Sequence, residues 1–218
     1  MNLSTIDSKQ LRIASISDIH LGHPTNHTTE IINNLLIAFP DTPETALLDY
    51  IFFCGDVFDS LLTLPESDVM EIKTWITRLL RLCKKHDIKL RILEGTPRHD
   101  WKQSKLFPDI NVLLDIGADL KYFNQLHIEY EHDHDMWLLF VPDECDATTE
   151  KTLSRVKELI KQKGIEKVDY ALMHGQFEYQ LPSFIKAAKH NSTEYLDLVR
   201  YLIFIGHVHT FSHYKNII

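Results

Sequence analysis

The chain has 218 residues, of which 44% are hydrophobic and 25% are charged. This composition is typical of a globular protein, and it excludes intrinsic disorder, collagen-like repeats and a coiled coil. The formal net charge of −8 excludes a general attraction to nucleic acid or to an anionic membrane, so a phosphate-bearing substrate must be attracted locally.

Further counts bear on location and chemistry. No stretch approaches the roughly 18 apolar residues of a membrane span, and the three cysteines are too widely spaced for a zinc-binding pair or a disulfide framework. We therefore expect a soluble, cytoplasmic protein with no membrane partner. Histidine is the unusual residue, because several of its 13 copies lie within two residues of an aspartate or another histidine.

Apolar runs alternate with amphipathic segments in the first half of the chain. We expect strands over residues 11–17, 50–54 and 90–93, because each is a short apolar run bounded by polar residues or glycine. Residues 31–39 and 69–83 place their apolar side chains at helical spacing. This alternation predicts a parallel, doubly wound α/β sheet.

The second half begins with a different pattern. Residues 126–130 and 137–141 flank a polar segment and predict two antiparallel strands joined by a hairpin. An amphipathic helix is expected over 149–163, followed by strands over 170–173 and 201–205. We see no linker or internal repeat, so residues 1–218 are expected to form one domain.

Five apolar runs end in side chains that can bind a metal or act in catalysis. Their residues are Asp18 and His20, Asp56, His99 with Asp100, His174, and His207 with His209. In open α/β sheets the carboxyl ends of the strands line the ligand crevice, so these side chains are expected to converge. A convergent cluster of histidine and aspartate predicts a metal site.

The number of candidate ligands exceeds the usual tetrahedral set of one zinc ion, which favours two divalent ions. Mixed imidazole and carboxylate ligands suit Mn, Fe or Zn better than Mg. Asp56 is placed to bridge two ions, the arrangement used for in-line displacement at phosphorus. Two divalent ions outweigh the two carboxylates and make the cleft locally positive, despite the acidic whole.

These motifs, DxH, GD, HD, HG and GHxH in that order, resemble the calcineurin-like metallophosphoesterase superfamily. Within it, GDVFD at 55–59 and EGTPRHDWKQS at 94–104 are similar to SbcD, the nuclease component of the SbcCD complex, especially its phage-encoded versions. The resemblance implies an α/β sandwich with helices outside the two sheets. It also implies a Mn-dependent DNA exonuclease and single-strand endonuclease of repair and recombination, with an SbcC-type SMC-like ATPase as partner and often a homodimer. A phage-encoded form would act in the host cytoplasm.

The resemblance assigns roles to individual residues. The first ion would be held by Asp18, His20, Asp56 and His209. The second ion would be held by Asp56, His174 and His207, and His99 would be the catalytic histidine. Asp59 fits two interpretations, a partner that supports the ligands or a cap of the following turn.

One departure from the family concerns Arg98, which stands immediately before His99 where the family has an asparagine ligand of the second ion. A guanidinium cannot bind a cation, and its repulsion beside a divalent ion could reach several kcal/mol at an effective dielectric near 20. We hypothesise a weakly occupied second site. The alternatives are that Arg98 swings outward to grip a DNA phosphate or that other ligands serve the second ion.

A second departure is that only nine residues follow His209. Family members continue with strands that complete the second sheet, and the nucleases among them add a DNA-contacting cap and a partner-binding helix. We therefore expect an incomplete second sheet with an exposed edge strand, without the cap or the partner-binding region.

Substrate contacts are expected close to His99. Arg98, Trp101 and Lys102 are candidates for gripping DNA, because an aromatic ring can stack on bases and cations neutralise phosphates. The alternative for Trp101 is an ordinary core tryptophan beside solvated lysines. Two other functions remain open, a phosphoesterase for a small substrate such as a nucleotide, phosphoprotein or lipid-linked phosphate, and a non-catalytic scaffold with an impaired second site.

Overall fold

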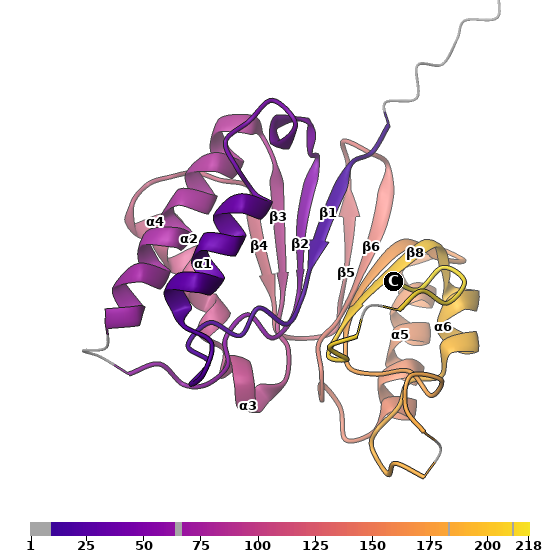
Figure 1. Ribbon diagram of the computed structural model, residues 1–218. Coiled ribbons are helices and arrows are strands. Elements are labelled where there is room, and N and C mark those ends of the chain that lie inside the picture. Colours follow the sequence, from indigo (N-terminus) through magenta and orange to yellow (C-terminus); the bar gives the residue numbers. More distant parts are fainter. Residues whose placement is uncertain (1–9, 64–66, 183, 211) are drawn as a thin grey trace, which may run out of the picture.

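A computed structural model describes residues 10–63, 67–182, 184–210 and 212–218. Two four-stranded sheets face each other in the middle of the molecule, and the long helices lie on their outer faces (Figure 1). In the part of the chain that the structure describes, no helix has both the length and the apolar character needed to cross a membrane.

The first sheet is wholly parallel, with its strands in chain order. Its strands are β1 (Ile13–Ile16), β2 (Tyr50–Cys54), β3 (Lys89–Leu93) and β4 (Leu120–Phe123). Successive right-handed crossovers that move in one direction leave every helix on the same face of a sheet. The helices of that face are α1 (Thr28–Ala38), α2 (Ser67–His86) and α4 (Leu106–Leu113). The short turns η1 (Thr45–Leu47), α3 (Pro97–Asp100) and η2 (Gln103–Lys105) lie in the connections.

The second sheet also keeps its strands in chain order, and only its first pair is antiparallel. Its strands are β5 (His127–Glu131), β6 (Met136–Val141), β7 (Val168–His174) and β8 (Val199–Gly206). Two helices, α5 (Thr149–Lys163) and α6 (Ser192–Leu198), cover its outer face (Figure 1). The hydroxyl of Thr148 accepts a hydrogen bond from the backbone of Lys151 and starts α5, and Gly164, at φ 69°, ends it.

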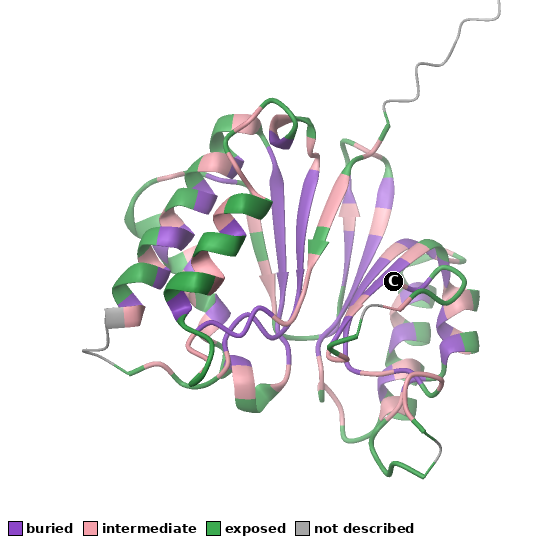
Figure 2. Cartoon of the chain, in the orientation of Figure 1, coloured by how far each residue is buried: buried purple, intermediate pink, exposed green. Residues whose placement is uncertain are grey.

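The inner faces of the two sheets share one apolar core. It contains side chains from both sheets, namely Tyr50, Phe52, Cys54 and Leu93 of the first and Met136, Leu138, Phe140, Leu172 and Phe204 of the second. The central strands are therefore buried on both faces, by helices outside and by the other sheet inside (Figure 2). The doubly wound sheet predicted from the apolar pattern is wrong, because burial on both faces here comes from a facing sheet and not from a second layer of helices. The α/β sandwich of two sheets with helices outside, which the resemblance implied, is present.

The expected exposed edge beside β8 is partly covered. The backbone of Ile203 donates to Asn216 at 2.8 Å, and Ile205 donates to Ile218 at 2.9 Å. Ile217 is buried in the core of the second sheet. The last residues thus bind along β8, and the prediction of an open edge there needs correction.

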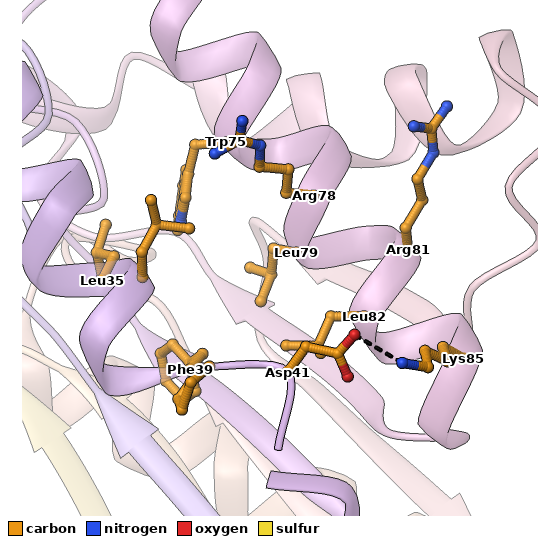
Figure 3. A pocket seen from close by; sticks show the side chains of 11 residues that line it. Leu35, Phe39, Asp41, Trp75, Arg78, Leu79, Arg81, Leu82 and Lys85 are labelled. Carbon is orange, nitrogen blue, oxygen red and sulfur yellow. Dashed lines mark hydrogen bonds and ion pairs between the residues drawn. The ribbon is translucent and has the colours of Figure 1, made fainter.

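The predicted strands and helices are present, each with small shifts at its ends. The strand β4 and the helices α4 and α6 lie outside the predicted set. A cavity of about 360 Å³ lies between α1 and α2, with an apolar floor that includes Leu35 and Trp75 and a basic rim formed by Arg78, Arg81 and Lys85 (Figure 3).

Candidate metal centre

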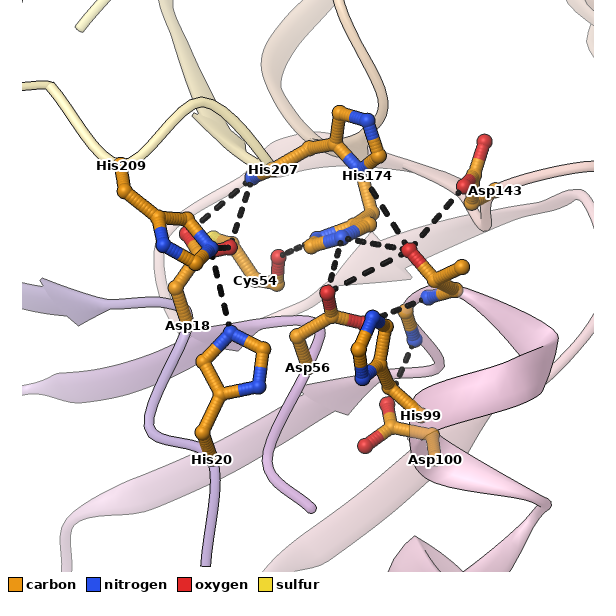
Figure 4. A network of polar contacts seen from close by, with 12 residues as sticks. Asp18, His20, Cys54, Asp56, His99, Asp100, Asp143, His174, His207 and His209 are labelled. Carbon is orange, nitrogen blue, oxygen red and sulfur yellow. Dashed lines mark hydrogen bonds and ion pairs between the residues drawn. The ribbon is translucent and has the colours of Figure 1, made fainter. Parts of the chain in front are cut away.

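All six predicted ligands lie at the carboxyl ends of the strands (Figure 4). They form two groups, in each of which the ligand atoms lie within 4.8 Å of one another. We call Asp18, His20 and His209 the first ligand group and Asp56, His174 and His207 the second ligand group. The convergence that the sequence predicts is therefore present, since β7 ends in one of these residues and β1, β2 and β8 are each followed by one within two residues.

The backbone turns sharply where these side chains begin. Asp18, His20 and Asp56 have φ values of 54°, 54° and 49°, in the left-handed region that L-residues rarely adopt. Two hydrogen bonds hold the turns together, from the backbone of Asp18 to Gly55 and of His20 to Asp56, each 3.1 Å long. Such backbone conformations persist only where the surrounding structure enforces them, and they concentrate at functional sites.

Glycine is required at position 55. Its φ is 88°, and a Cβ atom there would lie 2.3 Å from Nδ1 of His174. The imidazole of His174 therefore packs directly on the backbone of Gly55, which fixes the position of one ligand of the second group.

In the first ligand group the two imidazoles contact each other, and one of them also lies close to the carboxylate. The Nε2 atoms of His20 and His209 are 3.1 Å apart, and Nε2 of His209 is 3.4 Å from Oδ1 of Asp18. Burial lowers the pKa of His20, and the opposing charge of Asp56 does not fully restore it. A lowered pKa favours the neutral imidazole, which is the form that binds a metal.

The second ligand group is more deeply buried. Nδ1 of His174 donates to the carbonyl oxygen of Cys54 at 2.7 Å, so its Nε2 faces Oδ2 of Asp56 at 3.2 Å. A hydrogen bond of this kind fixes the tautomer and the orientation of a histidine ligand. Burial alone would lower the pKa of His174, but the hydrogen bond and charge of Asp56 raise it to about 9. The same contact holds the pKa of Asp56 below its usual value although burial opposes this.

This pKa predicts how binding at the second ligand group depends on pH. An ion must displace the proton of His174 below pH 9, because only a neutral imidazole binds a metal. We expect the affinity for Mn²⁺ to rise about tenfold per pH unit from neutrality towards that pKa, with release of one proton. Calorimetry in two buffers of different ionisation enthalpy measures both the affinity and the number of protons released. An affinity that does not change with pH would contradict this account.

Thr96 is a site residue that the sequence analysis missed. Its hydroxyl lies 3.3 Å from Oδ2 of Asp56, 3.4 Å from Nε2 of His174 and 3.3 Å from Nδ1 of His207. Its backbone N–H also donates to Oδ1 of Asp56 at 2.6 Å. The hydroxyl of Thr96 therefore lies among the three members of the second ligand group.

Arg98 takes an exposed position, as one of the alternatives for this residue requires. Arg98 is exposed on α3, and Thr96 is the described residue of this segment that contacts the second ligand group. Pro97 and Arg98 separate Thr96 from His99, so adjacency in sequence to His99 does not put Arg98 among the ligands. The structure gives no support to the hypothesis that Arg98 weakens the second site by repulsion.

Paired variants of these two residues test this correction. Thr96→Val removes the hydroxyl with little change in shape. It should lower the Mn²⁺ affinity of the second group by about 10–100-fold, the usual loss when a group that orients ligands is removed. Arg98→Ala should leave that affinity within about twofold. Equilibrium dialysis measures both, and the reverse ranking would restore the original interpretation.

His99 lies beside the first ligand group. Its Nδ1 donates to the carbonyl oxygen of Asp59 at 2.8 Å, and its ring centre is 5.1 Å from that of His20. The carboxylate of Asp59 is 3.3 Å from Nδ1 of His20, so Asp59 supports the ligands, one of its two predicted roles. Asp59 also forms a third group of candidate ligands with His20 and His99.

Asp100 positions the segment that carries His99. Its two carboxylate oxygens accept hydrogen bonds from the backbone of Gly95 at 2.7 Å and of Phe58 at 2.9 Å. Burial raises the pKa of Asp100 to about 7. Asp100 was expected at the site together with His99, but its role in holding the backbone was not predicted.

Trp101 and Lys102 lie outside both ligand groups. The Trp101 side chain is 53% exposed, and Lys102 is also exposed. The interpretation of Trp101 as a core residue is therefore wrong.

The donor atoms fit divalent metal ions. Each ligand group combines one carboxylate with two imidazoles, a set suited to Mn, Fe or Zn, and three protein ligands leave coordination positions open for water or substrate. No protein-family model and no curated protein matches the chain.

Proposed function

We propose that this protein is a metal-dependent phosphodiesterase of the calcineurin-like metallophosphoesterase type that hydrolyses DNA in the manner of the SbcD nucleases. The observation that carries the proposal is the pair of ligand groups at the carboxyl ends of the strands, with His99 beside them. The sandwich of two sheets with helices outside supports the same assignment.

The residues divide into two sets of ligands. Asp18, His20 and His209 would hold one ion, and His174 and His207 the other. Asp56 belongs to the second group and also acts electrostatically on His20, so it would be the carboxylate shared by the two ions. When bound, two such ions activate a water nucleophile and neutralise the charge of the phosphoryl group.

His99 would act on the substrate directly. Because Nδ1 donates to the Asp59 carbonyl, Nε2 is the nitrogen available to the substrate. The side chain is 39% exposed, so a phosphodiester can reach it. We assign His99 the role of donating a proton to the leaving oxygen or a hydrogen bond to the phosphoryl oxygen.

Exposed residues of α3 and of the turn after it favour a nucleic acid as substrate. Arg98 and Lys102 are two exposed cations within three residues of His99 in the sequence, and Trp101 in the same segment is also exposed. The net charge of −8 favours the second candidate, a phosphoesterase for small substrates, because a long polyanion is repelled by an acidic surface. An SbcC-type ATPase and a second copy of the chain are the partners that the nuclease proposal implies, and co-purification from the native host tests them.

The proposal is tested with three substrates and metal removal. The protein is stripped with a chelator, reloaded with Mn²⁺, and assayed on labelled linear duplex DNA, single-stranded DNA and bis-p-nitrophenyl phosphate. Hydrolysis of DNA that disappears on chelation and returns with Mn²⁺ supports the nuclease. Hydrolysis of the small ester alone supports the second candidate. If none of the three substrates is hydrolysed while metal is bound, the protein is a non-catalytic scaffold and the proposal is overturned.

A further inference from the structure

A cavity of about 510 Å³ adjoins the second ligand group. Its walls come from three connections at the carboxyl ends of the strands. They are the segment after β3 with Pro97, Trp101 and Lys102, the segment after β4 with Asn124 and Gln125, and the segment after β6 with Pro142 to Cys145. The volume lies in the range of about 300–1,000 Å³ that small-molecule sites occupy.

The cavity and the second ligand group share a wall. Asp143 lines the cavity, and its Oδ2 lies 3.3 Å from the hydroxyl of Thr96. That hydroxyl is in turn 3.3 Å from the Asp56 carboxylate. Figure 4 shows Asp143 beside the second ligand group, so a phosphate held at the ligand groups would have this cavity as its neighbour.

The side chains of the cavity suit a nucleobase better than a second phosphate. Trp101 offers a half-exposed aromatic face, on which any base can stack. Asn124 and Gln125 are exposed amides that can donate and accept hydrogen bonds at the edge of a base. Glu94, Asp143 and Glu144 also line the cavity, and their charge would repel an anion.

The backbone conformation of the turn fixes the position of Trp101. Trp101 and Lys102 both have left-handed backbone conformations, with φ values of 48° and 59°. The buried carboxylate of Glu94 accepts a hydrogen bond from the backbone of Lys102 at 2.6 Å and another from the hydroxyl of Tyr122 at 2.5 Å. These contacts hold a conformation that L-residues rarely adopt, and Trp101 lines the cavity as a result.

We propose that this cavity, with the Trp101 ring as its stacking surface, is a subsite for the nucleobase next to the phosphodiester held at the two ligand groups. Its link to catalysis rests on the proposed function, but binding of a base does not require a metal ion. A base subsite would favour substrates in which a nucleobase lies next to the phosphate, which are nucleotides and nucleic acids.

The test uses the metal-free full chain and nuclear magnetic resonance of the three tryptophan indole N–H groups. The signal that disappears in Trp101→Phe identifies Trp101. Titration with 2′-deoxyadenosine should shift this signal saturably and leave those of Trp75 and Trp137 in place, and 2-deoxyribose should shift none. Because the variants of Trp101 lack this signal, their affinity for 2′-deoxyadenosine is measured by calorimetry. Trp101→Ala should weaken binding about tenfold or more, the usual loss of one stacked base, and Trp101→Phe should retain most of it.

The control and the opposing outcomes separate this inference from the proposed function. Val112→Ala, at an 80% exposed position of α4, should bind deoxyadenosine like the unmodified chain. Equal shifts with deoxyribose, or unchanged affinity in Trp101→Ala, would overturn the subsite. If deoxyadenosine binds as expected but its 5′-monophosphate gains no affinity from added Mn²⁺, the proposed function fails while the subsite stands.

Discussion

Replacing His99 by alanine is expected to lower Mn²⁺-dependent hydrolysis of a phosphodiester by about 10²–10⁴-fold, the usual contribution of a positioned general acid or base. Nδ1 of His99 is engaged by the backbone carbonyl of Asp59 at 2.8 Å. Only Nε2 can therefore act on the substrate, and the loss of activity should reflect the loss of this nitrogen. Steady-state kinetics measure the loss, and elemental analysis of the dialysed protein should show unchanged metal content.

A matched control and a second readout give this prediction its specificity. His132 is exposed at the hairpin between β5 and β6, and His132→Ala should keep full activity. His99 also belongs to the third candidate group with His20 and Asp59. If His99→Ala loses an ion together with its activity, His99 is a ligand and its assignment as the residue that acts on the leaving group is wrong.

The largest expected effect on stability lies in the middle of β3, away from the ligand groups. Arg91 on β3 is completely buried, and its guanidinium binds Glu129 on β5 through two hydrogen bonds of 3.0 Å. It also donates to Asp119 at 2.8 Å. The contact joins the two sheets. Removal of the Arg91 cation leaves the negative charge of the buried Glu129 carboxylate with fewer hydrogen bonds and less opposite charge.

Arg91→Met should lower the free energy of unfolding by about 3–5 kcal/mol, because breaking a buried ion pair leaves an uncompensated charge. Urea denaturation followed by circular dichroism measures the loss. Lys157→Met is the control, since the side chains of Lys157 and its partner Glu194 are 48% and 45% exposed, and an exposed pair contributes about 1 kcal/mol or less. Equal losses in the two variants would show that the buried network does not hold the sheets together.

The metal ligands could be predicted because they are short motifs that end apolar runs. Asp18, Asp56 and His174 each follow a strand within two residues or end it, and parallel strands bring such positions to one edge. The position of Thr96 could not be predicted in this way, because two residues separate it from His99 and its hydroxyl carries no metal-binding signal. The resemblance pointed instead to Arg98, because the family has a ligand immediately before the catalytic histidine, but the turn into α3 leaves Arg98 exposed.

The two-sheet sandwich was implied by the family resemblance, whereas the apolar pattern alone could not predict it. A strand such as β2 is buried on both faces whether its second neighbour is a helix or another sheet, so its apolar sequence fits both arrangements. The strand β4 was missed because Leu120, Lys121, Tyr122 and Phe123 include a cation and are not fully buried. Only its pairing with β3 gives this segment its conformation.

The central claim is that the chain holds two ions at the two ligand groups. Crystals grown with saturating Mn²⁺ test it most directly by anomalous scattering at the manganese edge. We expect two peaks about 3.5–4 Å apart, one among Asp18, His20 and His209 and the other among Asp56, His174 and His207. A single peak, or peaks away from both groups, would contradict the dinuclear centre.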